Sequence, residues 1–216
     1  MTNILINKNS IANRFISELR DKSIQKDSMR FRKNIERIGE VMAYEISKTL
    51  NFDKKIIKTP LGEKETLLDN DKVVIASILR AAIPFHQGLL NYFDKAENAF
   101  ISAYRKGGKN NTFKIEVEYL ASPDLNDKTV ILIDPMLATG QSMYLSYQAL
   151  LKRGNPKHIH FASIIASSQA IKYINQMLNN VSFTLWIGDL DEKLNNKAYI
   201  IPGLGDAGDL SFGNKI

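Results

Sequence analysis

One segment of the chain combines a carboxylate with small and hydroxyl-bearing residues, the groups that often bind phosphates. This segment, Asp134–Ser142, reads DPMLATGQS and lies between the apolar run VILI and a stretch of helix-forming residues. Its Thr139-Gly140 pair and Ser142 would therefore stand where a buried strand gives way to a helix. Free backbone N–H groups and the helix dipole attract anions to such a position. The pattern predicts a phosphate-binding loop with the Asp134 carboxylate beside it.

Two arginines are predicted to reach the same edge of the fold. Arg80 follows the apolar run KVVIASIL, and Arg105 follows the run that ends at Tyr104. A guanidinium group matches phosphate oxygens with parallel hydrogen bonds, although a lone arginine at a strand end is more often a surface ion pair. Because both arginines and the Asp134–Ser142 loop follow strands, we expect them to converge on a polyphosphate.

A glycine-rich pattern, G-x-G-x-x-G, occupies Gly203–Gly208 near the end of the chain. A dinucleotide fold needs this pattern to open a helix inside a βαβ unit, with an acidic residue about twenty positions later. Only eight residues follow Gly208, so the dinucleotide interpretation fails. We expect instead a glycine-rich loop without a helix, whose backbone approaches a flat ligand.

Two further groups of residues have ordinary explanations. His158 and His160 have the spacing of metal ligands on one face of a strand, but no third ligand is evident, and packing is the favoured interpretation. Asp189 and Asp191 in GDLDEKLN could serve metal or acid–base chemistry, and a polar turn explains them equally well. No Walker A lysine pattern and no Ser-His-Asp order is present, so hydrolase and P-loop kinase functions lack support.

The elements that position these residues alternate along the chain. Apolar spacing predicts helices at 10–21, with Ser10 as N-cap, and at about 28–50. Buried strands are expected at 72–79, 98–104, 129–133, 158–166, 181–187 and 199–201, with helices at 84–92, from the loop to about 152, and at 169–178. The segment Phe113–Leu120 alternates apolar and charged residues, which indicates a half-exposed strand or hairpin arm. The expected fold is α/β, a mostly parallel central sheet flanked by helices.

Length and composition set the remaining limits. The 216 residues, 44% hydrophobic and 24% charged, are typical of one globular domain, with a helical N-terminal segment (1–58) and an α/β core with the glycine-rich tail (59–216). The chain has no cysteine, which excludes disulfides and zinc-thiolate sites. No signal peptide and no apolar run near the roughly 18 residues of a membrane helix is present, so a cytoplasmic location is the default.

The formal charge of +6 belongs to the N-terminal quarter. Residues 1–58 hold 13 Lys/Arg and 7 Asp/Glu, whereas residues 59–216 hold 16 of each. A solvated helical face is the favoured explanation. The alternative is a docking surface for a nucleotide effector or for RNA.

Four motifs together resemble the uracil phosphoribosyltransferases, a family of type I phosphoribosyltransferases. They are ILRAA (78–82), YR (104–105), DPMLATGQS (134–142) and YIIPGLGDAGD (199–209), and the similarity runs from RDKSIQKDSMRFR (20–32) to SFG (211–213). The resemblance implies the reaction of uracil with 5-phosphoribosyl diphosphate (PRPP) to give UMP and diphosphate, a pyrimidine-salvage glycosyl transfer. Mg²⁺ would be carried by PRPP, with no metal ligands set aside on the protein.

The resemblance also assigns roles to residues. The catalytic set would be Arg80, Arg105, Asp134 and Asp206. PRPP would be bound by these four together with Pro135, Met136, Leu137, Ala138, Thr139, Gly140, Gln141 and Ser142. Uracil would contact Ile200, Gly205, Asp206 and Ala207, largely through backbone. Either Asp206 or a diphosphate oxygen would take the N1 proton, and the loop 106–111 with the arm 113–120 would form a lid.

Three positions depart from the family pattern: Ala82 and Gln141 replace usual glycines, and Leu210 replaces a usual basic residue. The family implies a homo-oligomer, dimer or tetramer, and GTP is a candidate effector because it activates some members. No membrane or nucleic acid partner is expected. The competing function is an RNA-binding regulator of pyrimidine genes on the same fold. Those regulators carry two adjacent acids where this chain has Asp134-Pro135, and they lack IPGLGDAGD.

Overall fold

The computed structural model describes residues 1–107 and 113–215, and the side chains of 103–117 lie outside that description. Most of the predicted loop 106–111 therefore falls outside the described residues. No helix in the described part of the chain is long and apolar enough to cross a membrane.

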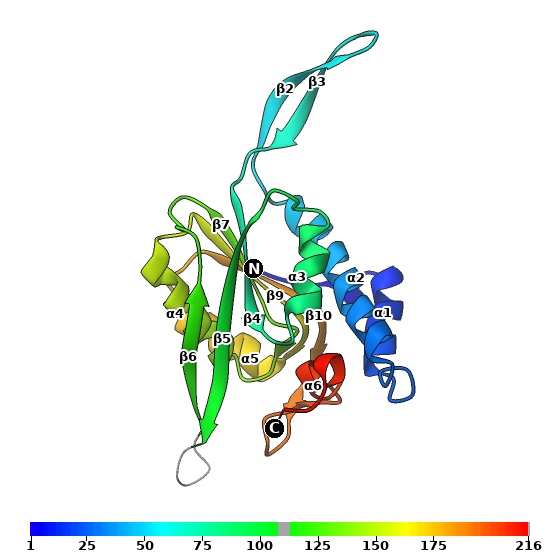
Figure 1. Ribbon diagram of the computed structural model, residues 1–216, viewed down its shortest axis with the longest axis vertical. Helices are drawn as coiled ribbons and strands as arrows, with labels where there is room; N and C mark the ends of the chain where they lie inside the picture. Colours follow the sequence, from blue (N-terminus) through cyan, green and yellow to red (C-terminus); the bar gives the residue numbers. More distant parts are fainter. Residues whose placement is uncertain (108–112, 216) are drawn as a thin grey trace.

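A central sheet runs through the molecule in the order β1-β10-β9-β7-β4-β5-β6 (Figure 1). Every neighbouring pair on this path is parallel except β5 and β6, which are antiparallel. The mostly parallel sheet predicted from the sequence is confirmed. Its strands are β1 (Thr2–Ile4), β4 (Val73–Leu79), β5 (Glu97–Gly107), β6 (Phe113–Ala121), β7 (Thr129–Ile133), β9 (His158–Ser167) and β10 (Phe183–Asp191), and the short β8 (Met136–Leu137) also pairs with β9.

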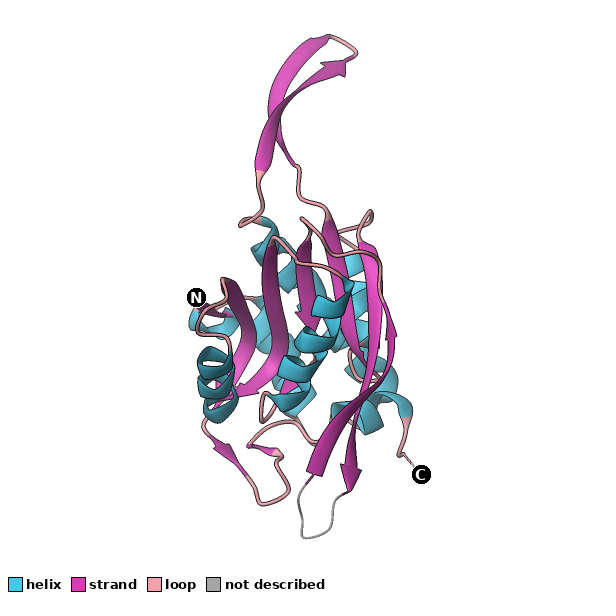
Figure 2. Ribbon diagram, turned by 90° about the vertical axis from the view of Figure 1, so that its left-hand side faces the viewer, coloured by secondary structure: helices cyan, strands magenta, loops and turns pink. Residues whose placement is uncertain are grey.

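Helices cover both faces of this sheet because its strands are apolar on both sides. In β7, Ile131 and Ile133 face one core cluster, whereas Val130 and Leu132 face the other. The first cluster contains side chains of α1 (Ile11–Arg20), α2 (Ser28–Ser47) and α3 (Ile83–Leu90); the second contains those of α4 (Gln141–Leu150) and α5 (Ser168–Met177). The strand ends are thereby fixed between two helical layers (Figure 2).

The predicted helix boundaries follow their caps. Ser10 caps α1 and forms a capping box with Asn13, as its position before the apolar stripe predicted. In α2 the Asp27 side chain accepts hydrogen bonds from the N–H groups of Met29 and Arg30. The helix ends at Ser47, three residues before the predicted end, since Lys48–Leu50 form a turn.

Several elements were not predicted from the sequence. β1 joins the sheet beside β10. The strands β2 (Phe52–Thr59) and β3 (Gly62–Asp69) pair as an antiparallel hairpin that projects from the body (Figures 1 and 2). The expectation of a glycine-rich tail without a helix is wrong, because α6 (Ala207–Phe212) follows Asp206. Its cap explains it: the Asp206 side chain accepts a hydrogen bond from the N–H of Asp209 at 3.0 Å.

The remaining elements are short. The turn helices η1 (Leu5–Asn7) and η3 (Leu151–Arg153) follow β1 and α4 respectively. The strands β11 (Lys193–Leu194) and β12 (Ile200–Ile201) pair with each other after β10. This small ribbon leads the chain from the sheet to the glycine-rich segment.

Candidate active site

A cleft of about 1060 Å³ lies at the carboxyl ends of β4 and β7. These strands are neighbours in the sheet, so the loops that follow them meet at one edge, where open α/β sheets bind ligands. The glycine-rich segment after β12 lines the same cleft. Twelve predicted residues line it: Arg80, Asp134, Met136, Leu137, Ala138, Thr139, Gly140, Ser142, Ile200, Gly205, Asp206 and Ala207.

The loop between β7 and α4 is held in place by contacts to β9 and α5. The Ser167 hydroxyl donates to the Ala138 carbonyl at 2.6 Å. Gly140 has φ +83°, and a Cβ there would lie 2.8 Å from the Tyr173 ring. Gly140 is the N-cap of α4 and supplies no side-chain cap. The first N–H groups of α4 therefore stand beside the cleft as a site for an anion.

Asp134 is the carboxylate at the end of β7, half-buried at the floor of this loop. Its Oδ1 accepts a hydrogen bond from the N–H of Met136 at 3.2 Å. Burial raises the pKa of Asp134 to about 7, and the Asp206 carboxylate contributes to the rise. Asp134 consequently changes charge near neutral pH and can either donate to or accept from a ligand hydroxyl.

Arg80 enters the cleft directly after β4. One of its terminal nitrogens donates to Asp209 and to the Gly213 carbonyl, each at 3.1 Å. Its Nε is buried and has no hydrogen-bond partner among the described residues, whereas the side chain as a whole is 38% exposed. Arg105 lies within β5, the neighbour of β4, and not after it: the strand predicted to end at Tyr104 continues to Gly107, paired with β6. The Arg105 side chain lies outside the described part.

Tight turns shape the glycine-rich segment. Gly203 has φ +57°, and a Cβ there would lie 2.2 Å from the Ile200 carbonyl oxygen; Gly205 has φ +96°. Only glycine adopts such conformations readily. The segment thus brings backbone to the cleft wall between β12 and α6.

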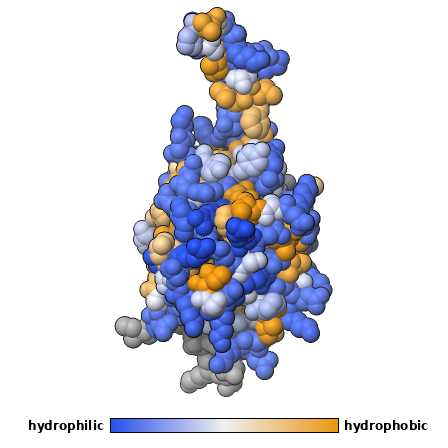
Figure 3. All heavy atoms as spheres, turned by 90° about the vertical axis from the view of Figure 1, so that its right-hand side faces the viewer, coloured by the Kyte–Doolittle hydropathy of each residue, from blue (hydrophilic) through white to orange (hydrophobic). Residues whose placement is uncertain are grey.

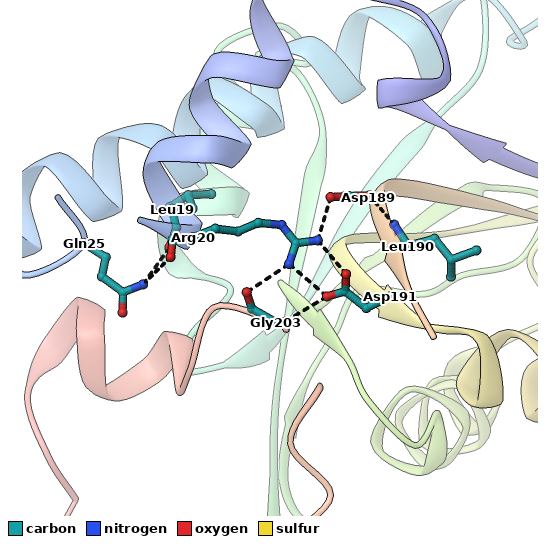
Figure 4. Close-up of polar contacts among 7 residues, drawn as sticks. All are labelled: Leu19, Arg20, Gln25, Asp189, Leu190, Asp191 and Gly203. Carbon is teal, nitrogen blue, oxygen red and sulfur yellow. Dashed lines mark hydrogen bonds and ion pairs between the residues drawn. The ribbon is translucent and has the colours of Figure 1, made fainter. Parts of the chain in front are cut away.

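Asp189 and Asp191 serve neither of the roles that the sequence left open for chemistry. Both accept hydrogen bonds from Arg20 at the end of α1, at 2.6 Å from Asp189 and 2.9 Å from Asp191 (Figure 4). They belong to β10, so the pair joins a helix to the sheet. The polar turn that would have explained both residues is wrong, since they lie in β10. No local pattern pointed to Arg20, because about 170 residues separate the groups.

The two histidines of β9 are packing residues, as favoured from the sequence. His160 is buried, accepts a hydrogen bond from Trp186 Nε1 at 3.1 Å, and has its pKa lowered to about 3 by that burial. His158 contacts the Thr184 hydroxyl. Both lie in the first three residues of β9, at the amino end of the strand, whereas the cleft lies at the carboxyl ends of the strands.

Several residues of the cleft were missed from the sequence, and two predicted ones do not line it. Asn214 and Lys215 line the cleft; lying beyond the glycine motif, they carried no pattern of their own. Pro135 is buried, and its carbonyl accepts from the N–H groups of Ile164 and Ile165. Gln141 is exposed at the first turn of α4.

The residues that depart from the family pattern are compatible with the local backbone and packing. Ala82 has φ −74°, so it needs none of the freedom that a glycine would give. Leu210 is half-buried and packs against the core cluster of α1–α3. Lys215 supplies a cation at the cleft where Leu210 does not.

About half of the thirteen cationic residues of the N-terminal quarter bind other groups of the molecule. Arg30 forms an ion pair with Glu18 at 2.8 Å, and Lys33 pairs with Glu36. Arg32 donates to the Ser211 carbonyl in α6 at 2.7 Å. These contacts support the structural explanation of the charge.

Comparisons with known proteins agree with this geometry. The profile of the family described as uracil phosphoribosyltransferase matches residues 6–214. A uracil phosphoribosyltransferase from Porphyromonas gingivalis is 57% identical, over 97% of this chain and 96% of its own. One from Pyrococcus furiosus is 40% identical, over 93% and 85%. A solved structure of a protein from Aquifex aeolicus is similar with a TM-score of 0.87 and 29% identity, over 99% of this chain and 98% of that one.

Proposed function

This chain belongs to the uracil phosphoribosyltransferase family, and we propose that its cleft joins uracil to the anomeric carbon of PRPP. The products are UMP and diphosphate, so the reaction is a glycosyl transfer in pyrimidine salvage. One observation carries the assignment of the cleft: the Asp134–Ser142 loop and the segment 200–207 line it together. About 1060 Å³ is at the upper end for one small ligand and suits two substrates.

The 5′-phosphate is assigned to the turn before α4. Thr139, Gly140 and Ser142 line the cleft there, and they offer hydroxyl and N–H donors beside the positive end of the helix dipole. The Asp134 carboxylate is assigned to the ribose hydroxyls, which donate to its ionised form.

The diphosphate is assigned to the two arginines. Arg80 is well placed because its side chain lines the cleft and is 38% exposed. Arg105 is assigned by the family motif alone, because β5 continues past it to Gly107. Lys215 adds a cation that lines the same cleft.

Uracil is assigned to the wall formed by Ile200, Gly205, Asp206 and Ala207. A uracil edge presents alternating N–H and C=O groups, which backbone groups can match in kind. The positive φ of Gly205 lets the backbone turn toward a flat ligand without a side chain between them.

Transfer breaks the bond from C1′ to the diphosphate oxygen and forms the bond from C1′ to uracil N1. The arginines stabilise the charge that develops on the departing diphosphate, and the two loops align N1 with C1′. The N1 proton passes to Asp206 or to a diphosphate oxygen. An Asp206→Asn variant with full turnover would exclude the carboxylate from that role.

Mg²⁺ is expected to arrive with the diphosphate of PRPP. The carboxylates of Asp134 and Asp206 line the cleft and are the hard oxygen ligands that Mg²⁺ prefers, so the residues present fit the ion. When bound, the ion neutralises phosphate charge.

A homodimer is the assembly that the surface of the hairpin β2–β3 supports. Nearly all of its residues are exposed, and Ile56, Leu61 and Leu67 are 66%, 100% and 59% exposed; apolar side chains are visible along it in Figure 3. A lone two-stranded hairpin is marginal in water, and exposed apolar groups mark interfaces. We expect Ile56→Glu to shift the mass measured by light scattering toward a monomer, with exposed Lys55→Ala as control; an unchanged mass would exclude the hairpin as the contact.

Four other expectations stay predictions: one domain over residues 1–216, residence in the cytoplasm, activation by GTP, and the lid at 106–120. The RNA-binding alternative lacks support, since the relatives named above are described as enzymes of this family. Adding GTP to the assay below tests the effector.

The test is incubation of the chain with uracil, PRPP and Mg²⁺, with UMP and diphosphate followed by chromatography. Equal yields of both products are expected, and competition among free bases should favour uracil. Hydrolysis of PRPP without UMP, or a preference for another base, would contradict the assignment of the 200–207 wall.

A further inference from the structure

The end of α1 holds the glycine-rich segment through a closed set of hydrogen bonds (Figure 4). Arg20 donates to the Gly203 carbonyl at 2.9 Å, and Asp191 accepts from the Gly203 N–H at 2.9 Å. Arg20 and Asp191 are themselves joined by two hydrogen bonds, at 2.9 and 3.0 Å. Both polar groups of one peptide residue are therefore held by the two members of one ion pair.

Neither Arg20 nor Asp191 lines the cleft, so the pair lies behind its wall. Gly203 is buried and does not line the cleft, whereas Gly205, two residues later, does. The Asp191 side chain is 7% exposed, and hydrogen bonds to charged groups are among the stronger ones in proteins. The contact consequently fixes the backbone two residues before Gly205, which lines the cleft.

Two neighbouring contacts support the same segment. Gln25, in the turn after α1, donates to the carbonyls of Leu19 and Arg20 at 3.1 and 3.2 Å, which fixes the end of that helix. Arg32 donates to the Ser211 carbonyl in α6. Residues 20–32, a stretch that the function above leaves without a role, thus bracket the glycine-rich segment at both ends.

We propose that Arg20 and Asp191 are positioning residues for uracil: their ion pair clamps Gly203 and so sets the backbone of Gly205–Ala207 to receive the base. The proposal rests on the assignment of uracil to this wall. Asp189 also pairs with Arg20, but among the described residues the hydrogen bonds of Gly203 go to Arg20 and Asp191, so Asp189 shares the ion pairing without the clamp. The phosphate loop has no part in it.

Asp191→Asn and Asp189→Asn in the full chain form a matched pair of variants, since each neutralises one carboxylate paired with Arg20. For Asp191→Asn we expect the KM for uracil to rise about ten- to a hundredfold, as for the loss of a hydrogen bond to a charged group, while the KM for PRPP changes less than about threefold. For Asp189→Asn we expect a smaller rise for uracil. Equal changes in the two variants, or equal changes in both KM values, would overturn the proposal in favour of a purely structural pair.

Arg20→Lys keeps the charge but not the two-pronged geometry, so it tests the clamp even where Asp191→Asn fails to fold. It should raise the KM for uracil selectively, and an unchanged uracil KM would overturn the proposal. Glu18→Gln breaks the other ion pair of α1, to Arg30, and should lower thermal stability without changing the ratio of the two KM values. The wild-type chain separates the two proposals: no UMP from it refutes the function, whereas an active wild type with no uracil effect in the variants refutes the clamp alone.

Discussion

Two parts of the chain line one cleft: the loop Asp134–Ser142, assigned above to phosphate (the phosphate loop), and the segment 200–207, assigned above to uracil (the uracil segment). The contacts that hold these two parts differ in range. The loop after β7 is fixed by groups close to it in sequence and space, such as Ser167 bound to Ala138, 29 residues away. The uracil segment is fixed by Arg20 and Arg32, which lie 183 and 179 residues from their partners Gly203 and Ser211. Variants can therefore damage one half while the other stays intact, and the separate KM values for PRPP and uracil report which half was affected.

The largest loss of activity is expected at Arg80, which lies between the phosphate loop and the uracil segment. Arg80 follows β4 but donates to Asp209 and Gly213 beside the uracil segment. Arg80→Ala removes a cation assigned to the departing diphosphate, so we expect kcat/KM to fall by about 100- to 1000-fold. Steady-state assays check this, with exposed Arg153→Ala as control. A change below tenfold would mean that the diphosphate is held elsewhere.

Gly203→Ala should damage the uracil half alone. A Cβ at this position would lie 2.2 Å from a backbone oxygen, and φ is +57°, so the turn has to shift. We expect the KM for uracil to rise by tenfold or more and the midpoint of thermal unfolding to fall, because strain of this kind costs about 1–3 kcal/mol. A matching rise in the KM for PRPP would show that the halves are coupled.

Gly140→Ala is the counterpart in the phosphate half. Here φ is +83° and the nearest atom to the new Cβ belongs to the Tyr173 side chain, at 2.8 Å, which can move. A smaller loss, about 1 kcal/mol, and a rise mainly in the KM for PRPP are expected. Gly62→Ala, with no atom within 4 Å of the new Cβ, is the control for thermal unfolding. An equal fall of the unfolding midpoint in Gly140→Ala and Gly62→Ala would show that the loss of stability does not come from the phosphate loop.

The smallest effect concerns pH and the carboxylate of the phosphate half. Burial raises the pKa of Asp134 to about 7, whereas an unfolded aspartate titrates near 4. Between about pH 4 and 7 the folded chain keeps a proton that the unfolded chain has lost, so this contribution to stability is lost as the pH rises toward 7. We therefore expect Asp134→Asn to raise the unfolding midpoint at pH 8 by about 2–4 °C.

Activity should follow the opposite course, because the ionised carboxylate accepts hydrogen bonds from the ribose hydroxyls. The kcat/KM for PRPP should therefore rise as the pH increases through about 7. In Asp134→Asn we expect this rise to disappear and kcat/KM to fall about tenfold. Melting curves and pH profiles of both proteins test this. If Asp134→Asn unfolds at a lower temperature than the wild type at pH 8, the expected stabilisation by removal of the buried charge is wrong.

The same difference in range explains what could be predicted from the sequence. The VILI run, the Thr139-Gly140 turn and the Ser10 cap are local patterns, so β7, the turn before α4 and the start of α1 were placed correctly. The partners of Asp189 and Asp191 could not be found, since nothing near them in sequence points to Arg20. The hairpin β2–β3 was missed because adjacent apolar residues, Ile56-Ile57 and Leu67-Leu68, break the alternation of a half-buried strand. The six-residue α6 was missed because it contains Gly208, a poor helix former.

The bond between Arg20 and Gly203 also sets an order of assembly during synthesis. A chain emerges from the ribosome N-terminus first, at about 5–20 residues per second. The partners of the phosphate loop, Ser167 and Tyr173, have been made while the last forty residues are still to come. Arg20 and Arg32 must wait for Gly203 and Ser211, nearly the whole chain later. We expect a nascent or prematurely ended chain to form its phosphate cradle first and to lack the wall for the base, so that the ability to select uracil is completed last.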